Sequence, residues 1–231
     1  MKAQVVSRQT IVPSPAPGVG VYEGSFYARH EGLDLISVAQ YTTRSDTVDG
    51  GIRRYSSDIG RSWSEPEKVV TGAIQYGGTM RRWYYPSGYV DPPTGRLLEF
   101  RNEGVLPRDN PMQGVRYWRC FYTVSEDGGK SFTVNEPIIQ DGAEFSAEHP
   151  WPGLWIGRNG ACIGAPTVLP LKDGTILVPC YQHPLGPDGQ YYNPGGGVRY
   201  HEAVMLRGRW RPDGGLTWQA SKPIQASLIA A

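Results

Sequence analysis

This sequence has few cysteines, no long hydrophobic run and no excess of charge of either sign. Its three cysteines, Cys120, Cys162 and Cys180, show no CxxC spacing, which favours buried free thiols over a metal or redox site. No stretch approaches the roughly 18 apolar residues of a membrane-spanning helix. With 23 Lys and Arg against 22 Asp and Glu, nothing in the charge predicts a nucleic-acid or anionic-membrane partner.

Motifs for cofactors, metals and export are missing as well. His183 stands outside any HExxH pattern, and the glycines at 195–197 lack the Lys-Ser/Thr of a phosphate loop, so neither a cofactor nor a metal is expected. The first 18 residues have no apolar segment before their prolines, so no signal peptide is visible. The sequence as it stands predicts a cytoplasmic protein, and a secreted one if its N-terminus has been trimmed.

Helical periodicity is hard to find, and short alternating or β-rich runs separated by tight turns recur instead. Examples are 34–43, 88–100, 115–125 and 167–182. The 30 glycines and 20 prolines fit many turns, and the 14 tyrosines and 7 tryptophans can supply a core. An all-β, antiparallel fold is predicted.

The strongest pattern is an eight-residue stretch, "SSDIGRSW" at 56–63, which returns at 125–132 and at 211–218. In each copy, an Asp can accept backbone N–H bonds and close a turn, a Gly permits a left-handed backbone, and an aromatic can enter the space between sheets. These positions are structural rather than catalytic: Asp58, Gly60, Trp63, Asp127, Gly129, Phe132, Asp213, Gly215 and Trp218.

Each copy ends a unit of about four strands, at roughly 21–72, 84–140 and 161–226. Repeated four-strand units that cannot bury both faces alone indicate the blades of a β-propeller. Two arginine pairs, Arg53-Arg54 and Arg81-Arg82, are interpreted as solvated strand edges.

Strand direction alternates in such a unit, so the short first turns and the repeated turns share one face. The long loops at 42–51, 101–115 and 182–199 emerge on the opposite face, where function is expected. The polar residues of these loops are Arg44, Asp46, Asp49, Arg101, Asn102, Glu103, Arg108, Asp109, His183, Asp188, Tyr191, Tyr192 and Arg199.

The repeated stretches resemble the Asp-box (bacterial neuraminidase) repeats of the sialidase superfamily, and the runs 90–102 and 164–183 are similar to hairpins of its second and third blades. The resemblance implies a six-bladed propeller that hydrolyses terminal sialic acid from glycans. The order of the matches implies that residues 1–231 form a single, incomplete propeller domain with about three blades. A truncated chain, or self-association of half-propellers, is therefore expected.

The same resemblance implies a site. The family's acid/base aspartate follows an arginine in the first long loop, which points to Asp46 and, as runner-up, Asp49. The family's first substrate arginine has no counterpart in Tyr22-Glu23-Gly24, which favours a sugar other than sialic acid. The residues predicted to bind substrate are Arg44, Arg101, Asn102, Tyr181, His183 and Tyr192.

Two functions fit this sequence. One is a sialidase-like, exo-acting glycoside hydrolase, with a related propeller glycosidase or polysaccharide lyase beside it. The other is a non-catalytic propeller that binds glycans or proteins, since aromatics and mixed charges on the loop face suit both. A glycan or small carbohydrate is the expected partner. Two further blade-start arginines and a Tyr/Glu pair downstream of Ala231 would support hydrolysis, and their absence would favour binding.

Overall fold

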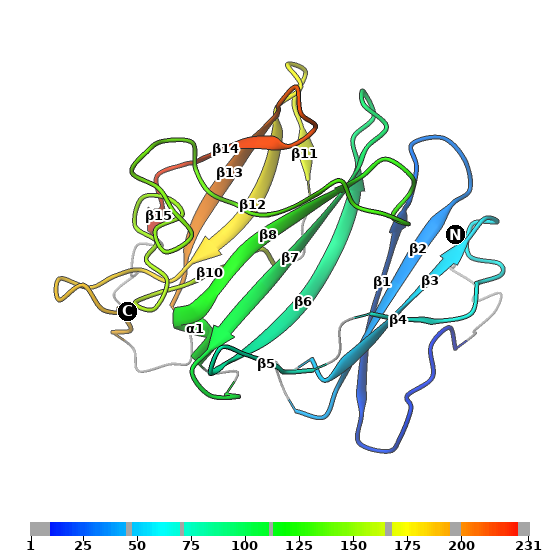
Figure 1. Ribbon diagram of the computed structural model, residues 1–231, viewed down its shortest axis with the longest axis horizontal. Coiled ribbons are helices and arrows are strands. Elements are labelled where there is room, and N and C mark those ends of the chain that lie inside the picture. Colours follow the sequence, from blue (N-terminus) through cyan, green and yellow to red (C-terminus); the bar gives the residue numbers. More distant parts are fainter. Residues whose placement is uncertain are drawn as a thin grey trace, which may run out of the picture.

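Antiparallel strands dominate the computed structural model (Figure 1), which describes residues 10–44, 48–69, 72–110, 113–164, 168–194 and 200–225. Figure 1 shows three sheets side by side in chain order. The first sheet has the order β1-β2-β3-β4, the second β5-β6-β7-β8-β9, and the third β10-β12-β13-β14 with β11 on β12 and β15 on β13. The predicted all-β, antiparallel class is confirmed.

The three sheets contain four, five and six strands in chain order. Those of the first sheet are β1 (Gly20–Tyr27), β2 (Leu35–Thr42), β3 (Gly50–Ser56) and β4 (Glu67–Val69). Those of the second are β5 (Ile74–Tyr76), β6 (Thr79–Val90), β7 (Leu97–Leu106), β8 (Trp118–Ser125) and β9 (Val134–Pro137), with helix α1 (Gly114–Tyr117) before β8. Those of the third are β10 (Ala161–Cys162), β11 (Leu169–Pro170), β12 (Ile176–Gln182), β13 (Glu202–Trp210), β14 (Leu216–Ala220) and β15 (Ile224–Gln225).

The core lies between the sheets because alternate side chains of each strand point to opposite faces. The larger cluster joins the second and third sheets, where Phe100 and Tyr122 meet Trp218 edge to face at 6.3 and 5.3 Å between ring centroids. A smaller cluster of Ile36, Val38 and Leu97, among others, joins the first sheet to the second. Helices in the described part of the chain are too short to cross a bilayer.

The first two repeated stretches form the same hydrogen-bonded turn. Asp58 Oδ1 accepts the Ser62 N–H (2.8 Å), and Asp58 Oδ2 accepts the Ser62 hydroxyl (2.6 Å). Asp127 and Ser131 repeat both bonds at the same distances. Hydrogen bonds from the Ser62 hydroxyl and backbone lower the pKa of Asp58 to about 2, so this carboxylate is ionised and fully engaged in the turn.

The third stretch differs from the prediction. Gly214 (φ 88°), rather than Gly215, is left-handed, and Thr217 donates to the Arg209 carbonyl instead of to Asp213. The reason is that β13 and β14 continue to within a few residues of the turn, which closes as a tight hairpin with the Arg211 N–H on the Gly215 carbonyl (2.8 Å).

The predicted insertion of the repeat's aromatic between sheets holds for one copy. Trp218 lies within β14 and is 2% exposed between the second and third sheets. Phe132 is 40% exposed and Trp63 is half-buried, because both follow a longer turn that ends before the next strand begins.

Ile59 stands where the other two copies have Gly128 and Gly214, and its backbone is left-handed (φ 58°) as theirs is. A β-branched residue is strained in this region by about 1–2 kcal/mol. Ile59→Gly is therefore expected to raise the free energy of unfolding by about 1 kcal/mol, since Ile59 is half exposed and little burial is lost. Thermal or urea unfolding measures it. Ile59→Ala keeps a Cβ and serves as the control, and an equal gain in both variants would contradict the explanation.

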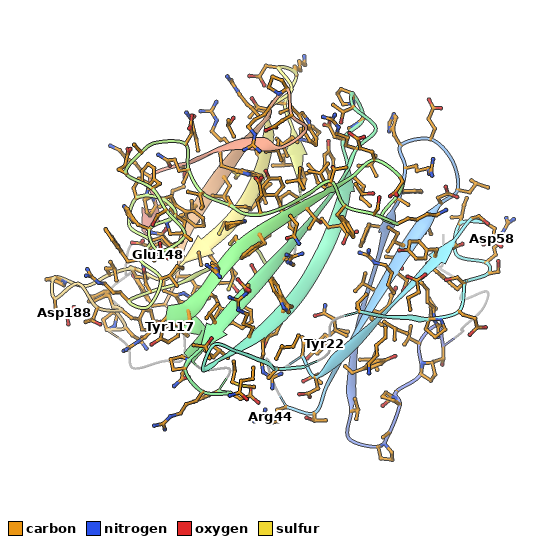
Figure 2. All side chains as sticks on the ribbon, in the orientation of Figure 1. Tyr22, Arg44, Asp58, Tyr117, Glu148 and Asp188 are labelled. Carbon is orange, nitrogen blue, oxygen red and sulfur yellow. The ribbon has the colours of Figure 1, made fainter. Side chains whose placement is uncertain are left out.

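The turns and the long loops lie at opposite ends of the sheets. At one end, Arg29 of the β1–β2 turn donates to the Asp127 carbonyl (3.4 Å), and Arg96 of the β6–β7 turn pairs with Glu126 (3.0 Å). Figure 2 places Asp58 at this end and Arg44 at the other. The repeated aspartates are therefore remote from the long loops, as the alternation of strand direction predicts.

Two sequence interpretations need correction. Arg53 and Arg82 are buried, not solvated, because each faces a carboxylate on a neighbouring segment: Glu99 for Arg53 and Asp109 for Arg82. The second long loop is also shorter than predicted. Because β6 is 12 residues long and pairs with β7 as far as Leu106, residues 101–106 belong to the strand.

Candidate functional site

Four charged side chains meet at the loop end, between the first and second sheets. Arg44 and Asp49 lie in the β2–β3 loop, Arg82 lies in β6, and Asp109 lies in the loop after β7. We call these four residues the charge cluster. Arg44 is labelled in Figure 2 at this end of the molecule.

Arg82 is the centre of the charge cluster. Its Nε and Nη2 donate to the two oxygens of Asp109 (2.6 and 3.0 Å), a bidentate pair, and its Nη1 donates to the Val48 carbonyl (2.7 Å). Asp49 Oδ1 lies 3.6 Å from the same Nη1. Arg82 is only 2% exposed, so these contacts fix the guanidinium and tie the loops of two sheets together.

The two carboxylates of the charge cluster are held ionised. Hydrogen bonding by Arg82 is the main cause that lowers the pKa of Asp109. Partial burial raises the pKa of Asp49, but hydrogen bonds from the Thr43 N–H (2.7 Å) and hydroxyl (2.8 Å), with the charges of Arg82 and Arg44, bring it below its ordinary value. At neutral pH both groups can accept protons and neither is poised to donate one.

Arg44 is the most exposed member of the charge cluster. Its side chain is 57% exposed, and Nη2 lies 3.9 Å from Asp109 Oδ2. It is therefore available to a ligand. Asp46, the first choice for acid/base from the sequence, lies outside the described residues.

The third sheet contributes an aromatic group at the same end of its strands. The Tyr181 and His201 rings stack at 4.4 Å, and His183 meets His201 and Tyr191 edge to face at 5.0 and 5.4 Å. His183 is buried, with Nδ1 2.9 Å from the Gly160 carbonyl oxygen. Tyr192 is more exposed and packs edge to face on Tyr200 (5.9 Å). The predicted sugar-binding residues Tyr181, His183 and Tyr192 thus share one region, and their binding role stays a prediction.

The other two predicted binding residues lie on opposite faces of β7. Arg101 faces the first sheet and stacks on the rings of Trp83 (4.4 Å) and Phe121 (5.2 Å). Asn102 faces the third sheet, where its amide donates to the Ile163 carbonyl (2.8 Å) and accepts the Ile163 N–H (2.9 Å). These two bonds give Asn102 a role in joining sheets, and substrate binding by it stays a prediction.

The stretch that lacks the expected arginine lies on β1. Glu23 Oε1 accepts bonds from the hydroxyls of Ser25 (2.5 Å) and Ser37 (2.6 Å), on the face of the first sheet that points away from the second. Tyr22 lies on the other face and is exposed (Figure 2). The position next to the second sheet is therefore held by a neutral tyrosine.

Sequence reasoning missed Arg82 and His201. Arg82 falls within the run 81–84, where polar and aromatic residues alternate. Because neighbouring residues of a strand point to opposite faces, this pattern could have indicated that Arg82 and Trp83 do so. His201 precedes a β-rich run and carries no motif. Asp109 was one polar residue among many in its loop, and only its contact with Arg82 distinguishes it.

No protein-family model matches the sequence, and no curated protein matches it. Among solved structures, the chain is similar to "Hadza microbial sialidase Hz136", with 14% identity and a TM-score of 0.54 over 86% of this chain and 40% of that one. The chain has a sialidase-like fold. At this identity the likeness concerns the fold alone.

Two further solved structures have lower TM-scores. The α-L-arabinofuranosidase Arb93A of Fusarium graminearum is 15% identical, with a TM-score of 0.47 over 88% of this chain and 49% of that one. An endo-arabinase of Bacteroides thetaiotaomicron is 12% identical, with a TM-score of 0.43 over 86% and 61%. The chain spans about half the length of these solved structures, all of which are named as glycoside hydrolases.

Proposed function

We propose that this chain is part of a glycoside hydrolase that removes terminal sugars from glycans, and that its three sheets are blades of a propeller. The observation that carries the proposal is the buried Arg82 between Asp49 and Asp109, at the end of the sheets where the long loops gather. Similarity of the fold to a sialidase supports it.

The charge cluster suits the electrostatics of this reaction. Glycosidases pair a carboxyl group that protonates the leaving oxygen with a second group on the other side of the scissile bond. Because Asp49 and Asp109 have lowered pKa values, we assign the acid/base role to Asp46, in the same loop as Arg44, and the positioning of Arg82 to Asp49 and Asp109. Arg44 is the most exposed member and would contact the substrate.

Two classes of sugar are candidates for the substrate. Sialic acid is the first substrate to test because of the resemblance and the fold. Tyr22 and Glu23 stand where the resemblance would place an arginine that binds the substrate carboxylate. Their presence favours a sugar that has no carboxylate, such as an arabinofuranoside.

A non-catalytic glycan- or protein-binding propeller is the second candidate function. The aromatic group of Tyr181, Tyr191 and His201 favours it, because these rings can bind a sugar without any acid/base residue.

An activity screen tests the proposal. Sialosides, arabinofuranosides and other aryl glycosides are incubated with the wild-type chain and with Asp46→Asn, Asp49→Asn and Asp58→Ala variants. Asp46→Asn is expected to reduce turnover at least 100-fold, because general acid–base catalysis contributes roughly 10²–10⁴-fold. Asp49→Asn should reduce it less, through misplacement of Arg82.

Asp58→Ala is the matched control at the other end of the molecule. It should lower the melting temperature, because the turn loses the bonds to Ser62, and leave turnover per folded molecule unchanged. Undiminished turnover in Asp46→Asn would reject the acid/base assignment. Binding of glycans without turnover of any substrate would favour the non-catalytic alternative.

A further inference from the structure

Two cysteines meet in the core between the second and third sheets, which lie side by side (Figure 1). Cys120 belongs to β8 and Cys180 to β12, and their Sγ atoms are 3.8 Å apart. A disulfide has an S–S distance of about 2.0 Å, so each sulfur has to move by about 1 Å to form one. The pair is therefore within reach of a covalent bond between two sheets.

The strand register points these two side chains at each other. Cys120 is directly opposite Asn102 in the β7–β8 pair, and Asn102 faces the third sheet, where it bonds to Ile163. Cys180 is directly opposite Val204, which belongs to the core between these sheets. Because residues directly opposite in an antiparallel pair share a face, Cys120 and Cys180 face each other.

The third cysteine lies apart from this pair. Cys162 of β10 is directly opposite Tyr181 of β12, and neighbouring residues of a strand point to opposite faces. The Cys162 side chain is therefore on the face of the third sheet that points away from the Cys180 side chain. The register thus singles out Cys120 and Cys180, whose separation of 60 positions gives no spacing motif in the sequence.

Burial governs the reactivity of the pair. Cys120 is 1% exposed and Cys180 is 5% exposed. Burial, together with the neighbouring Cys180 thiol, raises the pKa of the Cys120 thiol, and only a thiolate attacks a disulfide. Thiol–disulfide exchange therefore proceeds during folding or when the two sheets open transiently. Once the bond is formed, the same core shields it from reductants.

We propose that Cys120 and Cys180 are the site of a reversible disulfide that joins the second sheet to the third. The oxidant is a small-molecule disulfide such as glutathione disulfide. The Cys180 thiolate attacks it, its S–S bond breaks, and one glutathione thiolate leaves. The Cys120 thiolate then attacks Cys180 Sγ and displaces the second glutathione. The two cysteines lose two protons and two electrons in total, and the oxidant is reduced to two thiols.

The cross-link changes stability in a measurable way. It closes a loop of about 60 residues and restricts the unfolded chain. The melting temperature of the oxidised chain is therefore expected to lie roughly 5–15 °C above that of the reduced chain. The bond also fixes β12 next to Tyr181, whose ring stacks on His201 (4.4 Å). It lies outside the charge cluster and does not depend on hydrolysis there.

The test is oxidation of the full 231-residue chain in a glutathione redox buffer, both from the folded state and during refolding from guanidinium chloride. Refolding removes access to the core as a limit. After alkylation of the remaining thiols, mass spectrometry of unreduced peptides is expected to show Cys120 joined to Cys180 and an alkylated Cys162. If neither arm gives this cross-link, or if the disulfide contains Cys162, the proposal is overturned.

Single variants assign the effect to this pair. Cys162→Ala should keep both the cross-link and the rise in melting temperature on oxidation, and Cys120→Ala should lose both. Circular dichroism confirms that each variant is folded, and Cys180→Ala repeats the test from β12 if Cys120→Ala does not fold. A rise in folded Cys120→Ala equal to that of the wild type would contradict the proposal.

The outcome is separable from that of the proposed function. Asp46→Asn should form the cross-link like the wild type even if it turns over no glycoside. Formation of the disulfide in a chain without any hydrolytic activity would reject the proposed function and leave the cross-link standing. Turnover of a glycoside by a chain that never forms the disulfide would do the reverse.

Discussion

Replacing Arg53 with methionine is expected to lower the free energy of unfolding by about 3–5 kcal/mol, the usual cost of removing one partner of a buried ion pair. Arg53 joins the first sheet to the second through Glu99 and the Gly129 carbonyl. Methionine keeps much of the apolar stem and leaves the buried Glu99 without its ion-pair partner, with only the more distant charge of Arg101 acting on it. Urea unfolding of the wild type and of Arg53→Met measures the loss.

The double variant Arg53→Met/Glu99→Leu is the control, since it removes both charges and keeps the volume. It should recover most of the lost stability, because replacement of a buried pair by apolar residues is often neutral or stabilising. A double variant that is as unstable as Arg53→Met would show that packing around Arg53, and not the stranded charge of Glu99, sets the loss.

The pH dependence of Arg53→Met gives a second measurement. Burial already raises the pKa of Glu99, against the lowering effect of Arg53. Without Arg53 this pKa rises further, so the folded state holds a proton that the unfolded chain, with a pKa of about 4.3, releases. Stability of the variant is therefore present at low pH and is lost as pH rises through the folded pKa. It should be more stable at pH 5 than at pH 8, relative to the wild type.

Trp151→Ala is expected to cost about 3–5 kcal/mol of stability, as large-to-small changes at buried aromatics do. Trp151 is 1% exposed and belongs to the core between the second and third sheets. Its Nε1 donates to Gln182 Oε1 (2.8 Å), and this anchors the long segment 138–160 to β12. Urea unfolding measures the loss, and a cost below 1 kcal/mol would contradict this account.

Trp151→Phe separates packing from the hydrogen bond. It keeps a large ring and should cost about 1–3 kcal/mol, mainly because Gln182 loses a donor. The same variants should disturb the aromatic group of the third sheet, because Gly160, at the end of this segment, accepts the His183 N–H (2.9 Å). NMR signals of the His183 and His201 rings report this. Unchanged signals in both variants would mean that the segment does not position that group.

Local chemistry made much of the architecture predictable. Asp58 and Asp127 close their turns with the hydrogen bonds that an Asp-x-Gly-x-Ser pattern suggests, because every partner lies within four residues. The separation of the turn end from the loop end also follows from strand alternation. The third turn, at Asp213, could not be predicted in the same way, because β13 also pairs with β12 (Ile176 opposite Gly208) and Trp218 of β14 bridges to Gln140, both remote in sequence.

The candidate site was predictable only in part. The sequence pointed to the loop that contains Arg44, Asp46 and Asp49, and polar residues in a long loop are a general signal for function. It placed Asp109 on the same face as that loop, but it gave no reason to connect either of them with Arg82. The contact between Arg82 and the Val48 carbonyl joins two sheets. The two residues are 34 positions apart in the sequence, so no local pattern predicts that they meet.

By itself, the sequence determined the all-β class, the repeated turn and the end of the sheets at which the long loops gather. Each of these follows from interactions within a hairpin, where period-two alternation and turn chemistry act over a few residues. Only the tertiary structure decided that Arg53 and Arg82 are buried rather than solvated. Whether a long charged side chain is buried or exposed depends on which group of the neighbouring sheet lies opposite it. Here the opposing groups are Glu99 and Asp109, and they allow both guanidinium groups to be buried.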